Sequence, residues 1–203
     1  MPLPTAHPTR RSVAGLLAIV GACAAGASPG AARTDPRHDA AFAVPATPAG
    51  SPHDFDFEHG RWHTTVRRRL HPLGGSELWT DYAGTTCVLP IWSGRANLVE
   101  LDVSGPKGSL QALSLRLFDP RQERWTLNFS NPASGTLAPA MTGGFGGARR
   151  GVFYSAETFD SRPVLVRFII ESTSADSCRF EQAFSPDGGT TWETNWIALD
   201  TRP

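Results

Sequence analysis

From residue 62 to the end of the chain, apolar and polar side chains alternate in short segments. Residues 62–70 alternate until the turn sequence Pro72-Leu73-Gly74-Gly75, and residues 97–103 alternate until Gly105-Pro106. Alternation predicts β-strands, because successive side chains of a strand point to opposite faces. About nine such segments, with turn sequences between them and no convincing amphipathic helix, are typical of an antiparallel barrel or sandwich. Short turns favour a meander, and closure removes the exposed sheet edges, so we predict an all-β, up-and-down antiparallel β-barrel of about 8–10 strands.

One glycine-rich stretch interrupts this pattern between two predicted strands. It reads Gly143-Gly144-Phe145-Gly146-Gly147 and follows the tryptophan-containing segment over residues 125–129. Glycine weakens strands and is abundant in turns and loops. We therefore predict a flexible connection here, with the next strand over residues 151–159.

The first 32 residues have the three parts of a secretory signal. Arg10 and Arg11 precede an apolar run over residues 13–22, which is too short to span a bilayer as a helix. Small residues follow and supply an A-x-A-like cleavage site. The sequence predicts a removable signal peptide over residues 1–32 and export to the periplasm or the extracellular space. The arginine pair also fits the twin-arginine export motif, for which ordinary n-region charge is the alternative.

The segment after the signal contains two further features. Cys23 ends a Val20-Gly21-Ala22-Cys23 sequence that resembles a bacterial lipobox, so a lipid anchor at Cys23 is the alternative to cleavage further along. Residues 33–52 are rich in proline, alanine and other small residues, a composition that cannot bury a core and predicts a disordered linker. The β-barrel domain is then predicted over residues 53–203.

The domain opens with Phe55-Asp56-Phe57-x-x-Gly60-x-Trp62. This opening resembles an uncharacterised family of exported bacterial proteins that begin F-D-F-W-x-G-x-W, and the chain departs from that pattern at Glu58. Its G-x-W part is also similar to the calycin superfamily of lipocalin-like barrels, which hold small apolar ligands. The resemblance implies a lipocalin-like barrel in which Trp62, after Gly60, plugs one end and Arg202 covers Trp62. It implies no established activity.

The sequence Ser185-Pro186-Asp187-Gly188-Gly189-Thr190-Thr191-Trp192 fits the S-x-D-x-G-x-x-W pattern of an Asp-box. This pattern recurs in sialidase propellers, but the chain has one copy and a propeller needs several blades. We interpret it as a structural hairpin turn, in which Asp187 satisfies backbone groups and Trp192 packs beneath.

Two cysteines, Cys87 and Cys178, remain in the predicted domain. In an oxidising compartment they could close one disulfide, and two buried free thiols are the alternative. No C-x-x-C pair is present, which excludes the usual zinc and redox patterns. The histidine spacing of His59 and His63 suits a helix rather than this glycine-containing segment, so we predict no metal site.

Two arginines lie on apolar faces of predicted strands. Arg116 shares a face with Phe118, and Arg167 shares one with Leu165 and Ile169. A charge inside a barrel is costly unless it is paired, so each arginine is a candidate to bind a ligand carboxylate. The alternative for Arg167 is a pair with Glu181 or Glu171, or stacking on a tryptophan.

Two tryptophans, Trp125 and Trp196, are candidates to line a cavity, with core filling as the alternative.

Composition excludes several classes of function. The chain carries 19 basic and 19 acidic residues, which argues against nucleic-acid binding, and it lacks a polybasic stretch for an anionic membrane. It also lacks the serine-hydrolase, phosphate-loop and dinucleotide motifs.

We predict an exported barrel without a cofactor that binds a small, partly apolar or carboxylate-bearing ligand. The alternatives are a solid-core structural envelope protein, and a barrel enzyme acting on a small lipid-like or carbonyl substrate, with His63 or Glu58 as acid or base.

Overall fold

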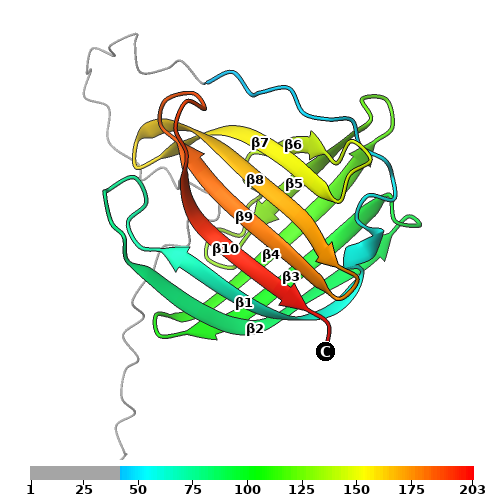
Figure 1. Cartoon of the computed structure of the whole chain (residues 1–203), viewed down its shortest axis with the longest axis horizontal. Helices are drawn as coiled ribbons and strands as arrows, with labels where there is room; N and C mark the ends of the chain where they lie inside the picture. The colour runs from blue at the N-terminus through cyan, green and yellow to red at the C-terminus, as the bar shows by residue number, and fades with distance from the viewer. Residues whose placement is uncertain (1–41) are drawn as a thin grey trace, which may run out of the picture.

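The computed structural model describes residues 42–203. These residues form one closed antiparallel barrel, in which each strand pairs with its neighbours along the chain and the first strand pairs with the last (Figure 1). The predicted all-β, lipocalin-like up-and-down barrel is therefore confirmed. The predicted signal peptide, with Arg10, Arg11 and Cys23, lies outside the described residues. In sequence order the elements are η1 (Asp56–Glu58), β1 (Gly60–Arg69), β2 (Trp79–Ile91), β3 (Ala96–Gly105), β4 (Gly108–Asp119), β5 (Arg124–Ser130), β6 (Met141–Gly144), β7 (Arg150–Phe159), β8 (Arg162–Ser174), β9 (Ser177–Ser185) and β10 (Glu193–Thr201).

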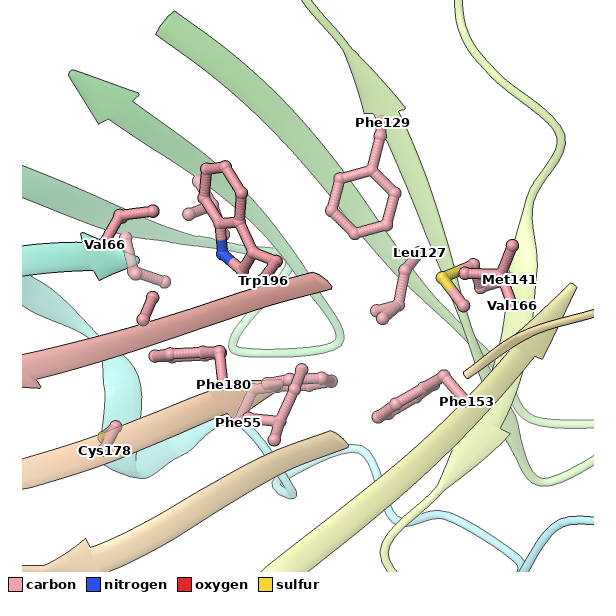
Figure 2. Close-up of a cluster of buried hydrophobic side chains, with 14 of the residues drawn as sticks. Phe55, Val66, Leu127, Phe129, Met141, Phe153, Val166, Cys178, Phe180 and Trp196 are labelled. Atoms are coloured by element: carbon pink, nitrogen blue, oxygen red, sulfur yellow. The ribbon is translucent and has the colours of Figure 1, made fainter. Parts of the chain in front are cut away.

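The alternating sequence pattern becomes an inside and an outside of the barrel. On β5, for example, buried and half-buried side chains alternate along all seven residues. Figure 2 shows side chains from several strands pointing into the interior, among them Phe129 on β5 and Trp196 on β10. Residues 42–203 contain no helix with the length and apolar character that crossing a membrane requires.

The glycine-rich stretch contains a strand that the sequence pattern did not predict. Strand β6 covers its first two glycines and pairs with β5 and β7, so the prediction of a flexible connection from Gly143 onward is wrong there. A Cβ atom at Gly143 would lie 2.0 Å from the carbonyl oxygen of Val152 on β7. Glycine at this position therefore permits close approach of the two strands.

The segment over residues 42–52, predicted as part of a disordered linker, lies along the outside of the barrel (Figure 1). Its backbone is extended, as its composition suggests, but it is held by hydrogen bonds. The Gly50 amide donates to the carbonyl of Glu123 at 2.6 Å, and the Gly146 amide donates to the carbonyl of Ala49 at 2.8 Å. The packed structure therefore begins before residue 53, because glycine and alanine let this segment approach the strand ends closely.

Candidate functional site

One end of the barrel is closed by η1 and by the side chains around Trp62. The indole Nε1 of Trp62 donates to the carbonyl of Glu58 at 2.6 Å. The Arg202 guanidinium lies 3.6 Å from the centre of the Trp62 ring and donates to the carbonyls of His59 and Phe57. Gly60 has a φ of +110°, and a Cβ atom there would lie 3.0 Å from the Arg202 guanidinium. The structure thus places Gly60, Trp62 and Arg202 together at this closed end.

A buried ion pair lies directly inside this closed end. Glu58 is 0% exposed and Arg116 is 3% exposed. The guanidinium donates to both carboxylate oxygens of Glu58, with one nitrogen at 3.1 Å from Oε1 and the other bonded to Oε2. It also lies over the Phe55 ring, 4.4 Å from its centre. The two charges cancel, so Arg116 meets its partner within the chain and does not need a ligand carboxylate to offset its burial.

A cavity of about 80 Å³ lies in the barrel interior next to this ion pair. Its polar lining is formed by Glu58, Thr64, Thr86, Ser114, Arg116, Gln182 and Asp200. Its apolar lining is formed by Val99, Leu101, Ala112, Leu113, Phe129, Phe168, Phe180, Trp196 and Ala198. Of the predicted ligand-binding residues, Arg116 and Trp196 line this cavity.

Asp200 on β10 is the cavity group with the least favourable surroundings. It is 1% exposed, and among residues 42–203 neither of its carboxylate oxygens has a partner at full hydrogen-bond geometry, although the Thr64 hydroxyl, which is bonded to Thr86, lies close enough to lower its pKa. Burial raises the pKa of Asp200 to about 7, and the nearby Glu58 carboxylate adds to the rise, while Thr64 and Arg116 oppose it. The Ser114 hydroxyl and the Arg116 Nε, both at the cavity, also lack partners in the described part of the chain. The cavity therefore contains polar groups whose hydrogen bonds are unfilled.

A second hollow of about 500 Å³ lies on the outside of the barrel wall beside this cavity. It is bordered by β2, β3, β4 and the connection from β5 to β6, and it shares Leu101, Ala112 and Leu113 with the cavity. Strand β5 is short, and its pairing with β4 ends at Leu113–Ser130, so the first residues of β4 have no β5 partner. The cavity and the outer hollow therefore adjoin at Leu101, Ala112 and Leu113.

The other predicted ligand-binding residues lie away from the cavity lining. Arg167 on β8 lies 3.8 Å from a Glu181 carboxylate oxygen, and its guanidinium is 4.4 Å from the centre of the Trp192 ring. This is the pairing and stacking arrangement that was the alternative to ligand binding. Trp125 is fully buried against Phe55, with the ring centres 4.8 Å apart. It therefore fills the core near the closed end.

The Asp-box forms the connection between β9 and β10. The Asp187 carboxylate accepts hydrogen bonds from the Thr191 amide and hydroxyl and from the Ser185 hydroxyl, which lowers its pKa to about 2. Trp192 donates to the carbonyl of Gly189 at 3.0 Å. These contacts lie within one turn, as the structural interpretation of Asp187 and Trp192 expects.

Cys87 and Cys178 are both free thiols, so the disulfide is corrected to the alternative of two unbonded cysteines. Their strands are not neighbours, since β2 pairs with β1 and β3 while β9 pairs with β8 and β10. Cys178 is buried beside Asp200, its register partner, whereas Cys87 is half-buried and borders the outer hollow.

The described residues offer neither a metal-binding group nor a free base at the cavity. Residues 42–203 contain no group of three or more histidine, cysteine or acidic side chains placed to hold a metal ion. His63 is exposed on β1, and Glu58 has both carboxylate oxygens bonded to Arg116. Neither offers a free base that faces the cavity.

Of the two acidic residues of the site, sequence reasoning named Glu58 only as a candidate acid or base and did not name Asp200. Asp200 continues the inward alternation of Trp196 and Ala198 on β10, which extends to Thr201. Glu58 was noted as a departure from the tryptophan usual at that position and as a candidate acid or base, but its pairing with Arg116 was not predicted. Its burial follows from η1 folding across the barrel end, which the strand pattern does not reveal.

No protein-family model matches the sequence, and no curated protein matches it significantly. Solved structures do resemble the barrel. The S-type phycobiliprotein lyase CPES from Guillardia theta superposes with a TM-score of 0.51 at 9% identity, over 73% of this chain and 90% of that chain. EF1p2_mFAP2b bound to DFHBI gives a TM-score of 0.41 at 9% identity, over 75% and 98% of the two chains. The redesigned β-barrel b11L5F_LGL gives 0.40 at 8% identity, over 76% and 99%. At such identity the similarity to the lyase concerns the fold alone, and this chain is similar to it as a lipocalin-like β-barrel.

Proposed function

We propose that this protein binds a small, partly apolar ligand inside its barrel. The observation that carries the proposal is the cavity beside the Glu58–Arg116 pair, where Asp200, Ser114 and the Arg116 Nε have unfilled hydrogen bonds. Concave, mostly apolar sites with a few converging polar groups are the usual form of small-molecule sites.

The same observation argues against a solid structural core. Protein interiors are close-packed, and a buried polar group without a partner costs about 1–3 kcal/mol. A barrel selected only for stability would fill this space with apolar side chains, as it does around Trp125 and Phe153. Four of the nine buried unpartnered side-chain atoms of residues 42–203 belong to Ser114, Arg116 and Asp200 at this cavity, and a ligand there would supply their missing partners.

The dimensions indicate how such a ligand would be held. The inner cavity of about 80 Å³ is smaller than the ~150 Å³ apolar cavity that accommodates benzene. It therefore suits a small head group, while the adjoining outer hollow of about 500 Å³ suits a larger apolar part. The ligand would pass between the two at Leu101, Ala112 and Leu113.

Native mass spectrometry of protein purified from cell extract, with thermal-shift assays against small amphiphiles, tests this proposal. We expect a retained or added ligand that stabilises the wild-type protein, because binding to the folded state raises its apparent stability. Ser114→Leu, which fills the cavity, should lose the adduct and the shift. Ser109→Leu, at an exposed position of the same strand, should keep both. A wild-type protein with neither adduct nor shift would contradict the proposal.

We also propose that the chain is exported, and this rests on the signal-like sequence of residues 1–32. N-terminal sequencing of the protein from a periplasmic or extracellular fraction tests it. The mature chain should begin near residue 33, or at a lipid-modified Cys23 if the lipobox is used. Recovery of the intact chain only from the cytosol would contradict export.

A further inference from the structure

The cavity contains one more acidic group than basic groups. The Arg116 charge is cancelled by Glu58 through two hydrogen bonds, which leaves Asp200 without a counter-charge. Arg202 stacks on the Trp62 ring and donates to the backbone carbonyls of His59 and Phe57. The local charge balance therefore favours a cation over an anion inside this barrel.

The groups that face Asp200 come from four elements. Thr64 on β1 and Cys178 on β9 are its direct register partners, and Glu58 on η1 and Arg116 on β4 act on it electrostatically. The Thr64 hydroxyl is 2.7 Å from the Thr86 hydroxyl and is bonded to it. Burial raises the pKa of the Cys178 thiol to about 12, so it stays neutral. Arg116 is the one cation among these groups, and its charge is already neutralised by Glu58.

The remaining lining also suits a cation. Phe180 and Trp196, on the same two strands as Cys178 and Asp200, line the cavity with aromatic rings. Ammonium groups are attracted to aromatic faces when they are desolvated. A carboxylate, by contrast, would meet Asp200 and Glu58 as like charges.

We infer that the ligand carries an amine, and that its ammonium group pairs with the Asp200 carboxylate while its apolar part extends along the aromatic lining toward Ala112. This inference rests on the proposed function of the barrel as a ligand-binding protein. It narrows the ligand to small amphiphilic amines and gives Asp200 the role of anchor.

The pairing has a defined pH dependence. The pKa of Asp200 in the free protein is raised to about 7, and an ammonium ion binds the ionised carboxylate. Affinity should therefore be full above about pH 7 and fall about tenfold for each pH unit below it, provided the amine stays charged. A neutral alcohol of the same length should show no such dependence.

Isothermal titration calorimetry of the full chain with n-hexylamine, n-hexanol and hexanoate tests the inference. We expect the amine to bind at least about tenfold more tightly than the other two near pH 8. Its affinity should fall about tenfold near pH 6 as Asp200 protonates. Asp200→Asn should abolish the preference and the pH dependence, whereas Asp102→Asn, at an exposed position on β3, should leave both unchanged.

The outcomes separate this inference from the function on which it rests. Equal binding of the three probes, or tighter binding of hexanoate, overturns the amine assignment and leaves a ligand-binding barrel. Failure of every probe to bind at millimolar concentration contradicts both. If Asp200→Asn does not fold, the pH dependence in the wild-type protein decides, because amine binding that is constant from about pH 6 to pH 8 refutes pairing with Asp200.

Discussion

Replacing Glu58 with glutamine should strongly destabilise the barrel, because it leaves the Arg116 charge buried without its counter-charge. Both side chains are almost fully buried, at 0% and 3% exposed, and they share two hydrogen bonds. Removing one partner of such a pair costs about 3–5 kcal/mol. Total domain stability is about 5–15 kcal/mol, so this is a large fraction of it. The melting temperature should fall by about 6–20 °C, at 2–4 °C per kcal/mol for a domain of this size.

Urea unfolding followed by tryptophan fluorescence measures this loss. Glu100→Gln, at an exposed position on β3, is the matched control and should change stability by less than about 0.5 kcal/mol. The double variant Glu58→Leu with Arg116→Met should recover most of the loss, because apolar side chains can replace a buried pair at nearly neutral cost. A Glu58→Gln loss below about 1 kcal/mol would refute the buried, charge-compensating role of Glu58.

Three further predictions concern the other features of the site. The pKa of Asp200 is raised in the folded state, so the folded protein favours the protonated carboxyl and loses stability as the pH rises toward 7. In urea unfolding, Asp200→Asn should therefore stabilise the free protein by about 2–3 kcal/mol more at pH 8 than at pH 5. An equal effect at both pH values would argue against a buried carboxyl. Ala112→Phe should obstruct the route between the outer hollow and the cavity, and should slow the binding of n-hexylamine at least about tenfold in stopped-flow fluorescence. The control Ala83→Phe, on the outer surface, should leave the binding rate unchanged. An unchanged rate for Ala112→Phe would place the entrance elsewhere. A reducing agent should leave the melting temperature unchanged because Cys87 and Cys178 are unbonded, and a drop would show that a disulfide forms.

Most of the barrel could be predicted because burial alternates along nearly every strand. Strand β6 was not predicted, because it has only four residues, two of them glycines. Its formation depends on how closely β7 approaches Gly143. The contacts of residues 42–52 were not predicted for a related reason, because an extended segment of small residues has no periodicity that marks it as packed. Packing against distant elements decided both cases.

The candidate site was predictable only in part. An inward arginine on β4 follows from alternation, and so does Trp196 on β10. The partner of Arg116 does not, because Glu58 reaches it from a sequence separation of 58 residues across the barrel end. Arg167 satisfied the same apolar-face criterion, yet its face is the outer one, where the β9–β10 hairpin brings Trp192 over it. Alternation specifies that two faces differ, and only the closed barrel shows which is inside.

The closing pair of strands has a consequence for folding kinetics. Pairing of β1 with β10 joins residues as far apart as His63 and Thr201, while every other strand pairs with sequence neighbours. Closing the longest loop carries the largest entropic cost, so we expect β10 to dock late. Asp200 is on β10, and docking moves its carboxyl from water into the interior. Raising the pH should therefore slow the final docking step and speed its reversal. A bound amine should oppose both effects, so the strand that holds the ligand would also be released more slowly when the ligand is present.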